Sequence, residues 1–142
     1  MWFFLLTQLW ALDLKTELAA AANAGLAQEA RKQSFDSLVS LGATDAQYLY
    51  DISQQKDADT RHRWVAIRAL GLIKSPEAER ILLRLLSDPE PAIRTASLSA
   101  LGDLGKETNV SMIARHLDDD AIIVRAAAAD SLGKLAVSKS II

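Results

Sequence analysis

Residues 88–105 read DPEPAIRTASLSALGDLG, and this stretch decides the fold. Its four opening residues combine two prolines with two acidic side chains. Such a combination suits a first helical turn, where proline is tolerated and acidic groups meet the positive end of the helix dipole. The apolar residues that follow recur at helical spacing on one face, and Gly105 is of the type that commonly ends a helix. The stretch therefore predicts a helix with one buried side.

The same pattern occurs three times with a period of 31 residues. Each copy has an aspartate in a turn, an arginine six positions later and a Leu-Gly pair near the end of the helix. A fixed period of this length is typical of repeat proteins, in which each copy is one structural unit. The aspartates are Asp57, Asp88 and Asp119, the arginines are Arg63, Arg94 and Arg125, and the glycines are Gly71, Gly102 and Gly133.

Each copy divides into two helical stretches. First helices are expected over residues 60–73 and 121–136 in the outer copies, with glycine serving the turn at each Leu-Gly pair. Ser75 and Pro76 predict the cap and first position of a second helix, and Thr108 or Asn109 is expected to cap the next one, over residues 108–117. Small residues fall where two first helices should meet, at Ala69, Ala100 and Ser131.

One helix pair cannot cover its own apolar face, so neighbouring pairs must stack to bury a continuous core. We therefore expect an all-α fold, a right-handed α-solenoid of stacked antiparallel helix pairs. Half of the residues are hydrophobic while only 6% are aromatic, a balance that favours packed helices over a β-sandwich. The repeat domain is expected over residues 25–142, with a divergent repeat at 25–56, clear repeats at 57–87 and 88–118, and a half repeat at 119–142.

The N-terminal segment, residues 1–24, has two interpretations. Residues 2–12 (WFFLLTQLWAL) are uncharged and strongly apolar, too short to cross a membrane as a helix but of the length of a signal-peptide core. Alternatively, residues 12–24 form a helix that caps the first repeat. We expect an exported protein, with a cytoplasmic one as the alternative, and membrane attachment only if the apolar segment remains as an uncleaved anchor.

The turn aspartate, the arginine six positions later and the Leu-Gly pair resemble the HEAT repeat. The short period and the alanine-rich first helices are most similar to the HEAT-like repeats of phycobilin lyase subunits. The resemblance implies a structural role for the polar positions: Asp57, Asp88 and Asp119 would accept hydrogen bonds at helix starts, and Arg63, Arg94 and Arg125 would bind turn carbonyls or those carboxylates in a ladder. The divergent repeat departs from the pattern, since Ser34 stands where arginine is expected.

Few residues offer catalytic or metal-binding chemistry. The chain has no cysteine, and its two histidines, His62 and His116, are not at metal-ligand spacing, so neither a metal nor a cofactor is expected. His116 aligns with the apolar Leu85 and is interpreted as a half-buried structural residue. The acidic run at 118–120 lacks the glycine and the alternating ligands of a calcium loop. With no nucleophile and base that can be paired, we expect a protein without catalytic activity.

The repeat pattern favours a binding surface over a catalytic site. In this architecture the second helices line the concave face, and their outward positions are rich in polar side chains. Arg84 and Arg115 occupy equivalent positions 31 residues apart, so we expect them to lie side by side. Arginine and tyrosine are enriched at protein interfaces. The candidate binding residues are Tyr48, Glu77, Arg80, Arg84, Thr108, Ser111 and Arg115.

Three hypotheses for function follow. The first is a non-catalytic scaffold that binds a protein or peptide through the concave face. The second, which rests on the resemblance alone, is a subunit of a phycobilin lyase-like enzyme that handles a tetrapyrrole. The third is nucleic-acid binding, which the net charge of −2 argues against. Self-association through the C-terminal helix is a further expectation, because residues 121–136 would have an uncovered side.

Overall fold

A computed structural model describes residues 13–140 of the chain. In this part of the chain all regular structure is helical, as predicted. No helix within it is both long and apolar enough to cross a membrane. The apolar residues 2–12, on which the signal-peptide interpretation depends, lie outside the described residues, whereas residues 13–22, within the expected capping helix, are helical.

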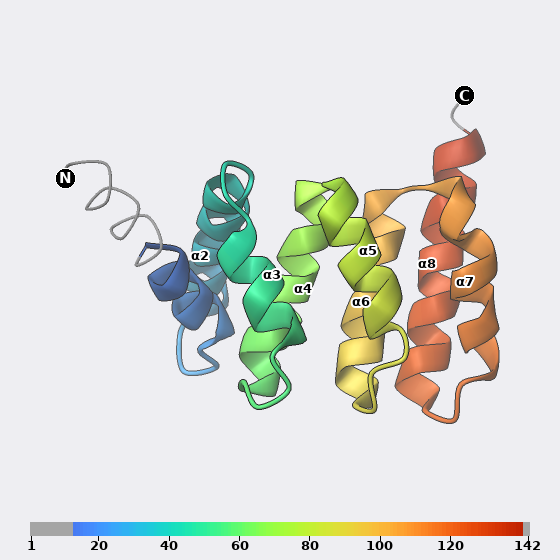
Figure 1. Cartoon of the computed structure of the whole chain (residues 1–142), viewed down its shortest axis with the longest axis horizontal. Helices are drawn as coiled ribbons and strands as arrows, with labels where there is room; N and C mark the ends of the chain where they lie inside the picture. The colour runs from blue at the N-terminus through green and yellow to red at the C-terminus, as the bar shows by residue number, and fades with distance from the viewer. Residues whose placement is uncertain (1–12, 141–142) are drawn as a thin grey trace.

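The helices follow one another along the long axis of the molecule (Figure 1). First helices pack side by side, α2 on α4, α4 on α6 and α6 on α8. The second helices lie against them, α3 on α4, α5 on α4 and α6, and α7 on α8. The chain is therefore an all-α solenoid. After the helix at 13–22, its elements are α2 (Gln28–Gly42), α3 (Gln47–Gln54), α4 (Thr60–Ile73), α5 (Pro76–Leu85), α6 (Pro91–Leu104), the 3-10 turn η1 (Glu107–Asn109), α7 (Val110–Ala114), the 3-10 turn η2 (Arg115–Asp118) and α8 (Ile122–Ser140).

The local signals in the two clear repeats act as the sequence indicates. The Ser75 hydroxyl accepts a hydrogen bond from the Ala78 amide at 3.0 Å, and Pro76 takes the first position of α5. Gly105 follows α6 with a φ of 77°, a left-handed conformation that glycine adopts without steric cost. These caps satisfy backbone groups that a helix end otherwise leaves without partners.

Two helix predictions need correction. The helix expected over 108–117 is instead one α-helical turn, α7, between the 3-10 turns η1 and η2. Asn109 does not cap it, because its side-chain amide donates to Glu79 Oε1 on α5 at 3.1 Å. The last first helix continues past Ala136 to Ser140.

The glycines of the Leu-Gly pairs serve close packing and not turns, which corrects the sequence interpretation. Gly71 and Gly102 lie inside α4 and α6. A Cβ at Gly71 would stand 2.7 Å from the backbone of Ala100, and one at Gly102 would stand 3.0 Å from the Ser131 side chain. Ala100 and Ser131 are themselves fully buried. The first helices therefore approach closely where a glycine on one faces a small residue on the next.

This packing predicts opposite effects of one substitution at two equivalent glycines. Gly71→Ala should lower the free energy of unfolding by about 1–3 kcal/mol, because the new methyl group overlaps the α6 backbone. Gly133→Ala should raise it by up to about 1 kcal/mol, because a Cβ there meets no atom within 4 Å and alanine favours the helix. Urea unfolding followed by circular dichroism measures both, and equal effects of the two substitutions would contradict this account of the contact.

Candidate functional site

Ion pairs between arginines and aspartates join successive turns along the edge of the stack where the first helices begin. Arg63 Nη2 on α4 donates to Asp88 Oδ2 at 2.8 Å, in the turn before α6. Its Nε donates to the Ser53 carbonyl oxygen at 3.1 Å, at the end of α3. The side chains of Arg63 and Asp88 are only 3% and 5% exposed. A buried charge is tolerated when it is paired and hydrogen-bonded, so this contact connects two repeats inside the core.

Arg94 repeats the contact one unit further along with two parallel hydrogen bonds. Its Nε and Nη2 donate to the two carboxylate oxygens of Asp119, at 3.0 and 2.9 Å. Its Nη1 donates to the carbonyl oxygens of Asp88 and Pro89 in its own turn, at 2.9 and 3.2 Å. The hydrogen bond from Arg94, aided by one from the Ala121 amide, lowers the pKa of Asp119. One guanidinium thus holds its own turn and the next in fixed relation.

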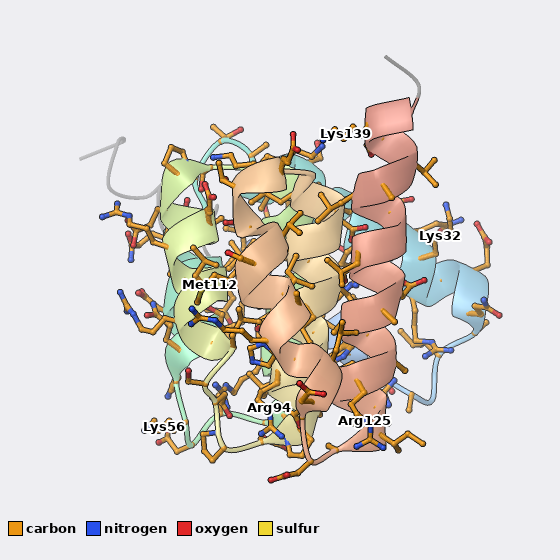
Figure 2. All side chains as sticks on the ribbon, turned by 90° about the vertical axis from the view of Figure 1, so that its right-hand side faces the viewer. Lys32, Lys56, Arg94, Met112, Arg125 and Lys139 are labelled. Atoms are coloured by element: carbon orange, nitrogen blue, oxygen red, sulfur yellow. The ribbon has the colours of Figure 1, made fainter. Side chains whose placement is uncertain are left out.

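Arg125 is the third arginine of the series. It lies along the same edge of the stack as Arg94 (Figure 2). Its Nη1 donates to the carbonyl oxygens of Asp119 and Asp120, at 2.8 and 3.1 Å, which matches how Arg94 binds its own turn. Within residues 13–140, Nε and Nη2 of Arg125 make no hydrogen bond.

Asp57 does not take the place predicted for it. It is exposed and makes no side-chain hydrogen bond in the described part of the chain. Asp59 caps α4 instead, accepting from the amides of Arg61 and His62 at 2.9 and 3.2 Å. The reason lies in the divergent repeat: Asp88 and Asp119 are each held by an arginine of the preceding repeat, and Ser34 occupies that position ahead of Asp57. The sequence contains a signal for this capping role, because Asp59 directly precedes the first residue of α4.

The residues predicted for binding lie on α3, α5 and the segment from η1 to η2, which together form what we call the second-helix face. Glu77 and Arg80 form an ion pair on α5. Arg84 Nη1 donates to Gln54 Oε1 on α3 at 2.7 Å. Thr108, Ser111 and Arg115 are exposed, and no hydrogen bond or ion pair of the described residues joins them to the α5 set. Tyr48 is half-buried against the core, and burial raises the pKa of its hydroxyl.

The second-helix face is held together by contacts that the sequence analysis missed. Glu79 on α5 binds the Lys106 ammonium and the Asn109 amide of the next repeat. These hydrogen bonds, with that of Lys106 the stronger influence, lower the pKa of Glu79. His116 Nε2 lies 3.0 Å from the Leu86 carbonyl oxygen and its Nδ1 lies 3.1 Å from that of Met112, so it connects two second helices as a half-buried structural residue.

Metal-binding geometry is not found in the described part of the chain. No three histidine or acidic side chains there come together as metal ligands would. His62 Nδ1 lies 3.1 Å from Asp59 Oδ1 at the start of α4, and this hydrogen bond lowers the pKa of Asp59. Both histidines are thus engaged in contacts that hold helices or turns in place.

Comparison with known proteins agrees with this geometry. A family model described as HEAT repeats matches residues 47–133. The chain therefore belongs to the HEAT-repeat family. No curated protein matches it. Among solved structures, human deoxyhypusine hydroxylase in complex with glycerol is similar with a TM-score of 0.66 and 19% sequence identity. The match covers 94% of this chain and 47% of that one, so the chain spans about half of the enzyme, and the likeness concerns the fold alone.

The buried ion pair predicts a large cost for removing one partner. Asp88→Ala should lower the free energy of unfolding by about 3–5 kcal/mol, because the Arg63 guanidinium stays buried without its carboxylate. Asp36→Ala is the matched control, since Asp36 pairs with Lys32 on the exposed side of α2 and should change stability by less than about 1 kcal/mol. Similar losses in the two variants, measured by urea unfolding, would show that the contact does not connect the repeats.

The lowered pKa of Asp119 predicts a dependence of stability on pH. A carboxylate with a lowered pKa in the folded chain stabilises it at neutral pH, and this contribution disappears as the pH falls through that pKa. Asp119→Asn should therefore be less stable than the parent chain at pH 7, and the difference should shrink below about pH 4. Urea unfolding from pH 7 to pH 2.5 at constant ionic strength tests this, and a difference that stays constant over the range would refute it.

Proposed function

We propose that this HEAT-repeat chain is a non-catalytic scaffold that binds a protein or peptide segment through the second-helix face. The observation that carries the proposal is the state of two arginines in equivalent positions of successive repeats. Arg84 and Arg115 are exposed, and neither has a carboxylate partner among residues 13–140. Arg63 and Arg94, by contrast, each bind an aspartate of the next repeat. The two surface guanidinium groups are therefore available to carboxylates of a bound segment.

Exposed apolar side chains on α7 and η2 support the same role. Val110 on α7 and Leu117 on η2 are exposed, and Met112 between them is only partly buried. Interfaces combine an apolar centre with arginine and aromatic side chains around it, and methionine adapts its shape to a partner. A segment with an apolar residue close to an acidic one has the complementary chemistry.

The contacts within the face favour binding in a further way. Arg84 binds Gln54, and Glu79 binds Lys106 and Asn109, so side chains of consecutive repeats hold one another. A surface that is ordered before binding loses less conformational entropy when a partner arrives. These contacts support a preformed platform and not one that must fold around its ligand.

The enzyme among the similar structures does not alter this proposal. The activity of that enzyme belongs to that protein, and 19% identity over a match that spans 47% of its length supports a shared fold only. The same fold serves unrelated functions, so function must be argued from the residues of this chain. Those residues supply carboxylate-binding arginines and apolar contacts, which is the chemistry of recognition.

Reversing the two surface charges tests the proposal. A photo-crosslinking amino acid placed at Ser111, which is exposed on α7, should join the chain to its partner in extracts of the source organism. Arg84→Glu combined with Arg115→Glu should reduce the yield of crosslinked partner by about tenfold or more, since each lost charge-assisted hydrogen bond is worth about 1.5–3 kcal/mol. Quantitative mass spectrometry of the crosslinked product gives the readout.

The matched control reverses two charges away from the face. Lys32 on α2 and Lys134 on α8 are exposed on first helices, and Lys32→Glu with Lys134→Glu changes the net charge equally. These substitutions should leave the crosslinking yield unchanged. Equal yields from both double variants would remove the arginines from the site, and crosslinking that is absent at Ser111 but present from α8 would remove the face itself.

A further inference from the structure

A cleft lies among the first helices, away from the second-helix face. It has a volume of about 530 Å³, and its walls come from the helix at 13–22, α2, α4 with the turn before it, and the start of α6. Small-molecule sites are typically cavities of about 300–1,000 Å³ with a few polar groups in a mainly apolar wall. We call this cavity the Trp64 cleft. The residues that bring charge or aromatic surface to it are Arg31, Asp59, Arg61 and Trp64.

Arg31 brings a buried donor without a partner to the cleft. Its Nε is shielded from solvent, yet no acceptor lies within hydrogen-bond distance of it. The rest of its guanidinium group likewise makes no hydrogen bond or ion pair within residues 13–140. Buried donors in native proteins are nearly always paired, so an unpaired one in the wall of a cavity indicates that a ligand supplies the acceptor.

Arg61 is a second guanidinium group that the chain uses only in part. Its Nε donates to the Ala22 carbonyl oxygen at 2.6 Å, which holds the side chain against the end of the helix at 13–22. Its two terminal nitrogens make no hydrogen bond in the described part of the chain, and no carboxylate there pairs with it. Arg61 is therefore positioned by one edge while its other edge stays available.

The acidic groups near the cleft are engaged elsewhere. Asp59 Oδ1 accepts from the two amides at the start of α4 and lies 3.1 Å from His62 Nδ1, so the positive end of the helix offsets its charge. Glu90 accepts a hydrogen bond from the Thr60 hydroxyl at 2.8 Å. Two unpaired guanidinium groups facing one capping carboxylate leave the cleft with a net positive charge, which suits an anion.

The number of available donors favours a phosphate over a carboxylate. One guanidinium group satisfies a carboxylate with two parallel hydrogen bonds. A phosphate monoester has three terminal oxygens and close to two negative charges at neutral pH, so it can accept from two guanidinium groups at once. Arg31 and Arg61 line the same cavity and both lack a carboxylate partner, which matches the second case.

Trp64 adds an aromatic surface to the same cleft. Its side chain is 41% exposed, and the Arg68 guanidinium carbon lies 5.9 Å from the centroid of the ring. Arg68 is itself held by Asp103 at 3.0 Å, so the contact restrains the indole before any ligand arrives. An exposed and restrained ring favours stacking with a planar group. Much of the remaining wall is apolar and consists of Ala21, Val65 and Ala92.

The repeat architecture does not require these side chains. The positions that correspond to Arg61 and Trp64 in the next repeat hold Ala92 and Thr95, 31 residues later. α6 nevertheless forms and packs like α4. The arginine and the tryptophan are therefore particular to this one repeat, and the common fold does not explain them.

We propose that the Trp64 cleft binds a small phosphate ester that carries an aromatic ring, a nucleoside monophosphate or an aryl phosphate. The phosphate accepts hydrogen bonds from Arg31 and Arg61, and the ring packs against Trp64 and the apolar wall. This site is separate from the second-helix face, so a small ligand and a protein partner can be bound at the same time.

Binding is measured by NMR on the full isotope-labelled chain. Adenosine monophosphate and naphthyl phosphate are the probes, and at least one of them should shift the signals of the Trp64 indole N–H and the Arg31 Nε–H in a saturable way. Adenosine and inorganic phosphate each carry only half of the required chemistry. Each should bind about tenfold more weakly than the better ester, since both halves contribute to affinity.

Substitutions locate the site. Arg31→Gln should weaken binding of the better ester by about tenfold, because a charge-assisted hydrogen bond is lost, and it should not lower the melting temperature, because Arg31 has no partner within residues 13–140. Trp64→Leu should weaken binding by about threefold to tenfold, and Trp64→Phe should retain most of the affinity. The matched control is Arg84→Gln with Arg115→Gln, two arginines outside the cleft, which should change nothing.

Three results would overturn the proposal. They are the absence of saturable binding by either ester up to about 1 mM, affinity that Arg31→Gln leaves unchanged, and signal shifts that fall on the second-helix face instead of the cleft. Tighter binding of adenosine monophosphate would assign the cleft to nucleotides, and tighter binding of naphthyl phosphate would assign it to simple aryl phosphates. The crosslinking experiment at Ser111 reports on the other face, so the two proposals succeed or fail independently.

Discussion

The arginine–aspartate contacts between successive turns are the constraint on which the stack depends. Arg63 and Arg94 each bind the aspartate that opens the next repeat, so the position of one helix pair sets the position of the following one. The same aspartates accept an amide hydrogen bond in their own turns, Asp88 from Glu90 and Asp119 from Ala121, both at 2.9 Å. Each carboxylate therefore shapes a turn and joins two repeats, which explains why aspartate and arginine recur with the period of the fold.

The close approach of first helices adds a steric constraint further along each helix, away from the turns that carry the ion pairs. Gly71 against Ala100 leaves no space for a further methyl group on the glycine, and Gly102 against Ser131 leaves little. The ion pairs at the turns and these contacts along the helices act at separate points on each interface, so together they determine both the spacing and the rotation of neighbouring repeats. The stability of such an array is approximately the sum of repeat and interface contributions. Each interface must therefore contribute favourably to the free energy of folding.

Periodicity was sufficient to predict the repeat architecture, because spacing along the chain determines which side chains share a helix face. The start of α5 agrees with the sequence analysis because a local signal, Ser75 followed by Pro76, specifies it. The break of the helix at 108–117 was not predictable, since it accompanies a contact of Asn109 with Glu79 in another repeat. The role of the glycines was misjudged because a Leu-Gly pair near a helix end has the same sequence whether glycine ends the helix or admits a neighbour.

The sequence alone could not predict which polar side chains on the surface are available for binding, because that depends on the hydrogen bonds and ion pairs they form with one another. Sequence spacing placed Arg84 and Arg115 in equivalent positions, but only the structure shows that Arg84 reaches Gln54 while Arg63 and Arg94 are committed to aspartates. The distinction matters for function, because an arginine that completes an interface within the chain cannot also recognise a ligand. Arg84 and Arg115 on the second-helix face have no carboxylate partner among residues 13–140, which is why we propose them, and not Arg63 or Arg94, as the groups that bind a partner.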